Sequence, residues 1–505
     1  MLELKNITIA LSQTGRELIS GFSFTLNRGE KAVIIGEEGN GKSTLLQYIY
    51  SPQLTESYCQ CSGEIITKGK LGYLPQMLDP ALAGLTLEQF FNGADFFNDA
   101  ALFYQLDLLP EHFTSQQTLG TLSGGEKVKV QLAKILMSQP DILLLDEPTN
   151  DLDIETLEWL EGFIRRSRLP ILFVSHDETL IERTANIVIH LEQLRKKTRP
   201  RATVARCGYR EYLKSRGAAF EKQEQVARKQ RSDHEKQMER WQQIYNRVDH
   251  EQSVISRQNP QGGRLLKKKM KSVLAQGRRL ERESEDFLEI PETEDAIITK
   301  FSPEISLPKG KVVLDFTLPL LQTGGKTLAR NISLFVAGGQ HVGIVGKNGV
   351  GKSTLLAAVW QALAPRRDII PALMPQNYRE KLDYSLTPVE YLAANYSKED
   401  MTKARTFMGN MRFTAEEMTG KIGNLSGGQK AKILFLDMVL QNANVLVLDE
   451  PTRNFSPLSS PVVRQALKEF GGAIISISHD RKYLEQVCDV VYQLTPEGMA
   501  AWQQP

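Results

Sequence analysis

One ordered set of motifs occurs twice in this chain, and that duplication restricts its fold more than any other feature. A glycine-rich loop ends in Gly-Lys-Ser-Thr at Lys42 and again at Lys352. Ser123 and Ser426 lie 303 positions apart, as do Glu147 and Glu450. A constant spacing across several motifs is what an internal duplication produces. We therefore expect two copies of one α/β nucleotide-binding domain.

Each glycine-rich loop stands between a short apolar run and an apolar helical stretch, which is the strand-loop-helix setting of a P-loop. Its backbone N–H groups and the following helix N-terminus can surround phosphate oxygens. Lys42 is expected to reach the β- and γ-phosphates, and Ser43 to bind Mg²⁺. Glu37 and Glu38 are unusual neighbours for a polyanion and could weaken nucleotide binding. The predicted phosphate loops are Gly36, Glu37, Glu38, Gly39, Asn40, Gly41, Lys42, Ser43 and Thr44, and Gly346, Lys347, Asn348, Gly349, Val350, Gly351, Lys352, Ser353 and Thr354.

Two carboxylates follow a buried-type strand in each copy: Asp146 and Glu147 in the first, Asp449 and Glu450 in the second. In P-loop enzymes the first acid supports Mg²⁺, and a residue placed like the second polarises the attacking water. Two acids closing an apolar run can also be a solvated strand end. The upstream P-loop lysine favours the enzymatic interpretation.

The remaining motifs make the chain resemble the ABC ATPase family. They are Gln76, Ser123-Gly124-Gly125 and His176 in the first copy, and Gln376, Ser426-Gly427-Gly428 and His479 in the second. The resemblance implies that the glutamines contact Mg²⁺ and the water, and that the histidines contact the γ-phosphate. It also implies an intramolecular head-to-tail pair in a monomer. Each signature loop, Ser123-Gly124-Gly125 or Ser426-Gly427-Gly428, would then cap the nucleotide held by the other copy.

The two copies differ in the D-loop that follows the second acid. The first reads Asn150-Asp151-Leu152-Asp153, whereas the second reads Arg453-Asn454-Phe455-Ser456 and has no acid. In the family this loop crosses the interface beside the opposite site, so we expect two unequal sites. The stretch 10–13 also lacks the aromatic residue that family members stack on adenine, which leaves base selectivity open.

The segment between the copies is strongly basic. From Arg195 to Ile290 it holds 25 Lys and Arg against 13 Asp and Glu, a net charge of +12 in a chain whose total is +2. The cluster Asn259-Pro260-Gln261-Gly262-Gly263 is a turn signal. Apolar residues at 3-4 spacing on both sides predict an antiparallel helical hairpin. The predicted seam residues are Met238, Trp241, Tyr245, Val248 and Ile255, then Leu266, Met270, Val273, Leu280 and Phe287, with Gln252, Gly277 and Ser284 in the remaining slots.

Basic residues gather around the predicted turn. Between Gln252 and Arg279 there is no acid, and the bases are Arg257, Arg264, Lys267, Lys268, Lys269, Lys271, Arg278 and Arg279. A charge run is often only a solvated helix face, but its place at a hairpin tip favours nucleic acid. Eight phosphate contacts would give a log–log salt slope of roughly −6 to −7.

A basic hairpin between two such modules resembles the ABC-F family of ribosome-associated ATPases. The resemblance implies ATP and Mg²⁺ as cofactors, and binding to rRNA and tRNA at the ribosomal exit-tRNA site. It implies either translation control or protection from antibiotics, and the sequence does not decide between them. The predicted domains are 1–194, a hairpin linker at 195–304 with its tip at 252–271, and 305–505.

The composition of the chain argues against a membrane-spanning protein and against a disulfide-bonded one. The sequence has no apolar run of the roughly 20 residues that a membrane-spanning helix needs, and four cysteines make no disulfide framework. We therefore expect a soluble, cytoplasmic protein with no transmembrane partner. An ATPase subunit of a membrane transporter is the alternative, although it has no evident use for a basic tip. A DNA-repair ATPase of the same superfamily is a third possibility, but those usually interrupt the ABC module itself.

Overall fold

The computed structural model describes residues 1–91, 100–108, 117–194, 199–254, 260–285, 301–393 and 397–502. Contacts divide the chain into two units. Met1–Tyr209 and Glu294–Pro505 form one unit, and Arg210–Thr293 forms the other. Both motif copies, called module 1 and module 2 below, therefore lie in the same unit.

Each module is built on a six-stranded sheet, and equivalent strands stand in the same order in the two sheets. Within each sheet the first five strands are parallel and the sixth pairs antiparallel. This confirms the predicted α/β fold with two P-loop domains. In order across the sheet of module 1, the strands are β5 Leu71–Leu74, β6 Ile142–Asp146, β7 Ile171–Val174, β3 Lys31–Ile35, β8 Ile187–Gln193 and β9 Arg199–Ala205. In the sheet of module 2 they are β13 Pro371–Met374, β14 Val445–Asp449, β15 Ala473–Ile477, β12 His341–Val345, β16 Val490–Thr495 and β17 Gly498–Ala501.

A smaller antiparallel sheet belongs to each module. Along its strands, more exposed residues tend to alternate with buried ones, as expected for strands with one face in the core. The strands are β1 Leu2–Leu11, β2 Glu17–Leu26 and β4 Cys59–Thr67 in module 1, and β10 Val312–Thr323 and β11 Lys326–Ala337 in module 2.

The central strands of the large sheets are buried at every position, because helices and the strands of the small sheets pack with them in the core. Their apolar runs supply the core. The helices of module 1 are α1 Lys42–Tyr50, α2 Leu87–Phe90, α3 Ala100–Gln105, α4 Gly124–Met137, α5 Ile154–Arg166 and α6 Glu178–Thr184. Those of module 2 are α10 Lys352–Leu363, α11 Pro388–Leu392, α12 Lys398–Asn410, α13 Ala415–Thr419, α14 Gly427–Leu440, α15 Ser460–Lys468 and α16 Arg481–Val487.

Strand order brings the motifs of each module together. In module 1 the strands β6, β7 and β3 are neighbours, and each ends at its carboxyl edge in a functional motif. Asp146 closes β6, His176 follows β7 and the P-loop follows β3. Residues more than 100 positions apart thus share one edge of the sheet, where ligands of open α/β sheets bind. Module 2 repeats the arrangement with β14, β15 and β12.

A second set of contacts joins the two modules through buried charges. Glu161 and Glu178 of module 1 and Arg464 and Arg481 of module 2 are each 3–6% exposed. Arg464 donates to both carboxylate oxygens of Glu178, at 2.6 and 3.2 Å, and Arg481 pairs with Glu161. Under the 303-residue offset, Glu161 corresponds to Arg464 and Glu178 to Arg481. Both equivalent positions are therefore acidic in one module and basic in the other.

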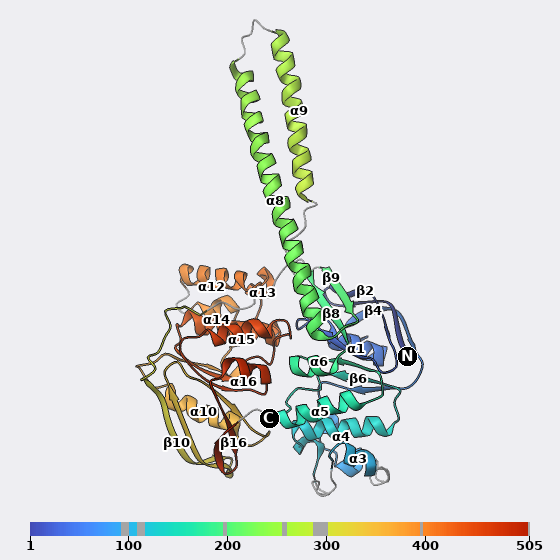
Figure 1. Cartoon of the computed structure of the whole chain (residues 1–505), viewed down its shortest axis with the longest axis vertical. Coiled ribbons are helices and arrows are strands. Elements are labelled where there is room, and N and C mark those ends of the chain that lie inside the picture. The colour runs from blue at the N-terminus through green and yellow to red at the C-terminus, as the bar shows by residue number, and fades with distance from the viewer. Residues whose placement is uncertain are drawn as a thin grey trace. The chain divides into compact units, whose positions relative to one another are not determined.

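The second unit is the predicted antiparallel hairpin, formed by α8 Tyr209–Val254 and α9 Pro260–Glu285 (Figure 1). His234 bonds the Leu280 carbonyl at 3.0 Å, and Trp241 donates to the Val273 carbonyl at 2.8 Å. The 46-residue α8 is about 70 Å long at 1.5 Å per residue. None of the helices in the described ranges is both long and apolar enough to cross a membrane.

The described seam residues are all at least partly buried, and four of them are buried: Val248, Val273, Gly277 and Leu280. The gap at Gly277 has a clear reason: a Cβ there would lie 2.7 Å from the Trp241 indole. Ile255 and Phe287 lie outside the described residues, as does the side chain of Ser284.

The turn prediction is wrong for four of its five residues. Pro260, Gln261, Gly262 and Gly263 form the first turn of α9, and Asn259 lies outside the described residues. Proline fits the first turn of a helix because its fixed φ is helical and its missing N–H would be unbonded there anyway. A Pro-Gly cluster can therefore begin a helix as well as form a turn.

Candidate functional site

The P-loop of module 1 holds its lysine tightly. Gly41 adopts φ 87° before α1, so the chain can bend sharply into the helix. Lys42 is buried, and its Nζ donates to the carbonyls of Gly36 at 2.8 Å and Glu37 at 3.0 Å. Burial lowers the pKa of Lys42, an effect that nearby acids oppose, Glu147 most of all. Lys352 makes the equivalent bonds to Gly346 and Lys347.

The predicted metal ligands of module 1 lie next to each other. Ser43 donates to Asp146 at 2.8 Å, and Tyr73 donates to the other Asp146 oxygen at 3.3 Å. Burial raises the pKa of Asp146 to about 6 against the opposing effect of the Ser43 bond, so the carboxylate is ionised at neutral pH. A hydroxyl beside an ionised carboxylate is a donor set that suits Mg²⁺. Burial likewise raises the pKa of Asp449, opposed by a hydrogen bond from Ser353.

Both predicted catalytic glutamates have strained backbones. Glu147 has φ 47° and Glu450 has φ 53°, in the left-handed region that side chains other than glycine rarely adopt. Such strain persists only where the surrounding structure enforces it, and it is common at functional sites. Here each glutamate directly follows a buried central strand, which fixes its carboxylate at the sheet edge.

The environments of the two glutamates differ. His176 Nε2 lies 2.9 Å from a Glu147 oxygen, whereas His479 Nε2 lies 3.8 Å from Glu450. Burial would raise the pKa of Glu147, but the charge and hydrogen bond of His176 outweigh it and the pKa is lowered. Burial and the neighbouring Asp449 raise the pKa of Glu450 to about 8. Burial and the charge of Lys352 lower the pKa of His479 to about 3. The two sites are therefore chemically unequal.

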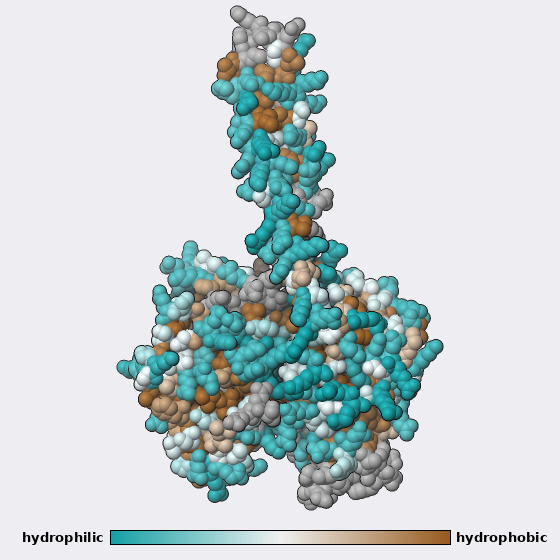
Figure 2. All heavy atoms as spheres, in the orientation of Figure 1, coloured by the Kyte–Doolittle hydropathy of each residue, from teal (hydrophilic) through white to brown (hydrophobic). Residues whose placement is uncertain are grey.

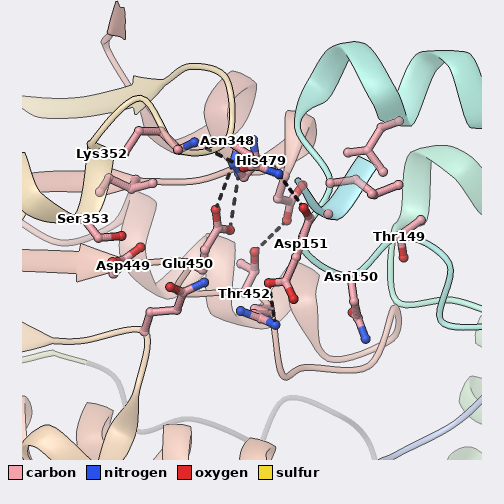
Figure 3. Close-up of a pocket in the computed structure, with 18 of the residues that line it drawn as sticks. Thr149, Asn150, Asp151, Asn348, Lys352, Ser353, Asp449, Glu450, Thr452 and His479 are labelled. Carbon is pink, nitrogen blue, oxygen red and sulfur yellow. Dashed lines mark hydrogen bonds and ion pairs between the residues drawn. The ribbon is translucent and has the colours of Figure 1, made fainter. Parts of the chain in front are cut away.

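A cavity of about 540 Å³ lies between the P-loop of module 2 and the D-loop of module 1 (Figure 3). It is lined by the predicted phosphate, metal and catalytic groups of module 2, and by signature and D-loop residues of module 1. The groups of module 2 include Asn348, Lys352, Ser353, Gln376, Asp449, Glu450 and His479. Those of module 1 include Gly124 of the signature loop, Asn150 and Asp151 of the D-loop, and also His176. The structure thus brings Gly124 to the same cavity as Lys352, as the head-to-tail interpretation requires. The glutamines differ in place: Gln376 lines this cavity, and Gln76 is an exposed residue just after β5.

The D-loops take part in the module interface. Asp153 caps α5 and also accepts a bond from the Asn348 N–H at 3.4 Å, while the Asn348 side chain donates to the Asp151 carbonyl at 2.5 Å. Arg453, from the D-loop of module 2, forms an ion pair with Asp151 at 2.9 Å. The acid-free D-loop therefore contacts its counterpart directly.

Each signature loop begins a helix. Ser123 and Ser426 are the N-caps of α4 and α14, and each forms a capping box with the residue three positions on. The serine side chain accepts a backbone N–H, at 3.3 Å in both copies. The glycines after each serine thus present backbone N–H groups at a helix N-terminus, where anions bind favourably.

Two features of the interface were not predicted from the sequence. The first is the buried pairs of Glu178 with Arg464 and of Glu161 with Arg481, whose opposite charges are visible when the copies are aligned at the 303-residue offset. The second concerns Glu37 and Glu38, which were expected to affect only the nucleotide at their own P-loop. Their side chains bond module 2 instead.

Comparison with known proteins agrees with this geometry. The profile of the family described as "ABC transporter" matches residues 19–150 and 329–453, which together are about half of the chain. The chain belongs to this ABC family. The two matched ranges confirm that the chain holds two ABC domains in tandem, and the chain is therefore an ABC ATPase.

Its relatives include members of the F branch, which confirms the resemblance to ABC-F proteins. "ABC transporter F family member 2" of Arabidopsis thaliana is 25% identical over 97% of this chain and 76% of its own length. "Probable ATP-binding protein YheS" of Escherichia coli K12 is 27% identical over 94% of this chain and 76% of its own length. "Putative ATP-binding protein YdiF" of Bacillus subtilis is 30% identical over 76% of this chain, and the match spans 56% of that protein.

Solved structures share the fold. A complex of the archaeal ribosomal stalk protein aP1 with the archaeal ribosome recycling factor aABCE1 superposes with TM-score 0.60 at 15% identity, over 98% of this chain and 89% of that one. "RNase-L Inhibitor" gives TM-score 0.58 at 15% identity, with the same coverage. This ABC ATPase therefore shares the tandem arrangement of those proteins.

The residues present fit ATP and Mg²⁺. The N–H groups of each P-loop and its lysine would hold the phosphates, while Ser43 with Asp146, and Ser353 with Asp449, would hold the metal. Bound Mg²⁺ would offset the phosphate charge as the bond to the γ-phosphate breaks. The Glu147 carboxylate is buried beside His176, and the Glu450 Oε1 atom has no hydrogen-bond partner within the described chain, which suits residues that act on water.

Proposed function

We propose that this ABC-F protein binds the ribosome in its ATP-bound form, at the exit-tRNA site, and acts on the peptidyl-transferase region through the tip of its hairpin. ATP would hold the two modules together, and hydrolysis would release the protein. It would work as a monomer in the cytoplasm, in translation control or in protection of the ribosome from antibiotics. Relatives named as ABC-F members and the fold of a ribosome recycling factor support this proposal.

The observation that carries the proposal is the charge of the hairpin end. Arg264, Lys267, Lys268, Lys269 and Lys271 of α9 are all exposed. Cations on a helical rod can contact phosphates along a nucleic acid backbone, and such contacts contribute strongly to affinity.

Among the predicted bases that the structure describes, Lys269 and Arg279 have acidic neighbours. Lys269 lies 3.3 Å from Glu251 on the facing helix, and Arg279 lies 2.8 Å from Glu283. Both acids flank the acid-free stretch, so the sequence window did not include them. If the other six bases contact phosphate, the log–log salt slope falls to about −4 to −5.

Apolar side chains are exposed among these cations. Leu265 is 70% exposed and Val254 is 69% exposed. A shallow groove beside them is lined by Gly263, Leu266, Met270, Leu274 and neighbouring polar residues. Figure 2 shows apolar patches bordered by hydrophilic surface on the upper part of the hairpin. Exposed apolar groups beside cations suit contacts with unstacked bases as well as with phosphates.

The test uses the full chain with Glu147→Gln and Glu450→Gln, which should stall hydrolysis and prolong the ATP-bound form. We expect this variant to sediment with 70S particles when ATP is present and to be released as salt rises. The same variant without ATP is the control. If it remains in the soluble fraction with ATP, the ribosome proposal is wrong, and capture of a membrane partner instead would favour a transport role.

A second measurement separates the two ribosomal roles. Expression in a drug-sensitive strain, challenged with lincosamides, pleuromutilins, streptogramins, macrolides and phenicols, should raise tolerance only if the protein protects ribosomes. Unchanged tolerance to all of them, together with ATP-dependent ribosome binding, would favour translation control.

A further inference from the structure

Two unusual sequence features meet at one interface. The P-loop of module 1 carries Glu37 and Glu38 where that of module 2 has Lys347 and Asn348, and the D-loop of module 2 has Ser456 where that of module 1 has Asp153. Ser456 and Ser459 both donate to the same oxygen of Glu37, at 2.9 and 2.5 Å. The acid missing from one loop is thus present on the loop that faces it.

The reverse arrangement holds at the other interface. There the acids are on the D-loop side, where Asp153 accepts from the Asn348 N–H and Glu155 lies 3.0 Å from Lys347. A glutamate at position 347 would face Glu155, and an aspartate at position 456 would face Glu37. Like charges at this range repel. Each P-loop therefore matches only the D-loop it meets.

Glu38 contacts the signature loop of module 2, which is expected to cap the nucleotide at Lys42. Its Oε2 accepts the Gly428 N–H at 2.7 Å, at the N-terminus of the signature helix α14. The same oxygen lies 3.3 Å from the place that a Cβ would take if Gly427 were replaced by a residue with a side chain. This N-terminus is where a signature loop presents N–H groups to a nucleotide phosphate. The carboxylate of Glu38 therefore holds a group that ATP at Lys42 would also use.

The second site lacks this competition. Asn348, the counterpart of Glu38, carries no charge and donates to the Asp151 carbonyl instead of accepting from the signature helix. Gly124 of that signature loop lines the 540 Å³ cavity beside Lys352. Glu38 is itself exposed, so a nucleotide can displace it.

We propose that the Glu38 carboxylate competes with the γ-phosphate of ATP for the Gly428 N–H. The Lys42 site therefore closes on ATP less readily than the Lys352 site. Glu37 is a positioning residue in this arrangement, because its bonds to Ser456 and Ser459 hold the acidic P-loop against module 2. The consequence is an order of filling: ATP closes the Lys352 site at a lower concentration, and the Lys42 site only when ATP displaces Glu38.

The test isolates the Lys42 site by adding Lys352→Ala to the full chain. Binding of AMP-PNP and of ADP is then measured by calorimetry with and without Glu38→Gln. AMP-PNP should bind roughly three- to tenfold more tightly in the Glu38→Gln protein, as expected when an exposed, charge-assisted hydrogen bond no longer competes. ADP lacks the γ-phosphate that would compete with Glu38, so its affinity should change less than about twofold by the same reasoning.

Two further variants keep the test decisive. Glu56→Gln removes an exposed acid elsewhere in module 1 and should leave both affinities unchanged. Glu38→Asn, which installs the residue of the second P-loop, should behave like Glu38→Gln. An equal gain for AMP-PNP and ADP would mean general repulsion, and no gain, or a loss with a lower unfolding temperature, would mean a purely structural contact. Any of these results overturns the proposal.

This inference depends on ATP binding by the two modules and not on the ribosome. Failure of the sedimentation experiment would leave it intact, and failure of the calorimetric experiment would leave the ribosome proposal intact.

Discussion

Arg464 and Glu178 form a bidentate ion pair between the modules, with N–O distances of 2.6 and 3.2 Å. Lys482 adds a third contact to the same carboxylate at 3.1 Å. Arg481 and Glu161 form the pair at the equivalent positions. Two copies of module 1 meeting in the same way would bury four glutamates together, and two copies of module 2 would bury four arginines. The charges therefore favour pairing of unlike modules over pairing of like ones.

Reversal of one charge should destabilise this interface. Arg464→Glu places a second carboxylate opposite Glu178 and should lower the free energy of unfolding by at least the roughly 3–5 kcal/mol typical of breaking a buried pair. Adding Glu178→Arg should recover part of that loss. Urea unfolding measures both effects. Arg405→Glu, at an exposed position of α12, is the matched control; a similar loss in that control would argue against a special role for Arg464.

The two ATP sites should hydrolyse at different rates. Glu450→Gln leaves only the Glu147 site, whose carboxylate has a lowered pKa, and Glu147→Gln leaves only the Glu450 site. At pH 7 and saturating ATP, we expect the Glu450→Gln protein to retain more activity, because Glu147 is ionised and Glu450 is largely protonated. Steady-state phosphate release measures this, and equal rates would exclude functional asymmetry.

The same pair of variants should differ in pH dependence. The pKa of about 8 at Glu450 means that its carboxyl loses a proton as the pH rises through that value. Activity of the Glu147→Gln protein should therefore rise between about pH 7 and pH 9, since one pH unit changes the ionised fraction up to tenfold. Activity of the Glu450→Gln protein should already be near its plateau. Parallel profiles for the two proteins would contradict this assignment.

Gly277 should be essential to the hairpin packing. Gly277→Ala puts a Cβ 2.7 Å from the Trp241 ring, and overpacking of this kind costs about 1–3 kcal/mol. Gly217→Ala, in α8 with no atom within 4 Å of the added Cβ, should instead stabilise its helix by up to about 1 kcal/mol. Hydrogen exchange of the hairpin amides measures both. Equal protection in the two variants would mean that Trp241 moves without cost.

The hairpin lysines should set the salt dependence of ribosome binding. Changing Lys267, Lys268 and Lys271 to Gln should reduce the log–log salt slope by about 2 to 3, since each phosphate contact contributes about 0.7 to 0.9. Changing the exposed lysines Lys68, Lys398 and Lys403 of the modules removes the same charge from elsewhere. If this second triple variant has the same effect, net charge rather than the tip drives binding.

The sequence by itself determined the fold of both modules and the identity of the groups at their sheet edges. Apolar runs ending in Gly-Lys-Ser or Asp-Glu are local patterns, and the strand order of an α/β sheet then brings them together, as Lys42, Asp146 and His176 are. The hairpin also followed from local periodicity. Its turn did not, because Pro260 and the glycines after it are equally compatible with the first turn of a helix.

Only the tertiary structure decided what the unusual residues do. Glu37, Glu38, Ser456 and Arg464 have partners some 290 to 420 positions away, on the other module. Such contacts depend on how two folded surfaces meet, which local pattern does not encode. An acidic P-loop looks unfavourable in its own module and becomes favourable opposite the hydroxyls and helix N-terminus of its partner, because electrostatic energy depends on distance in space and not on distance along the chain.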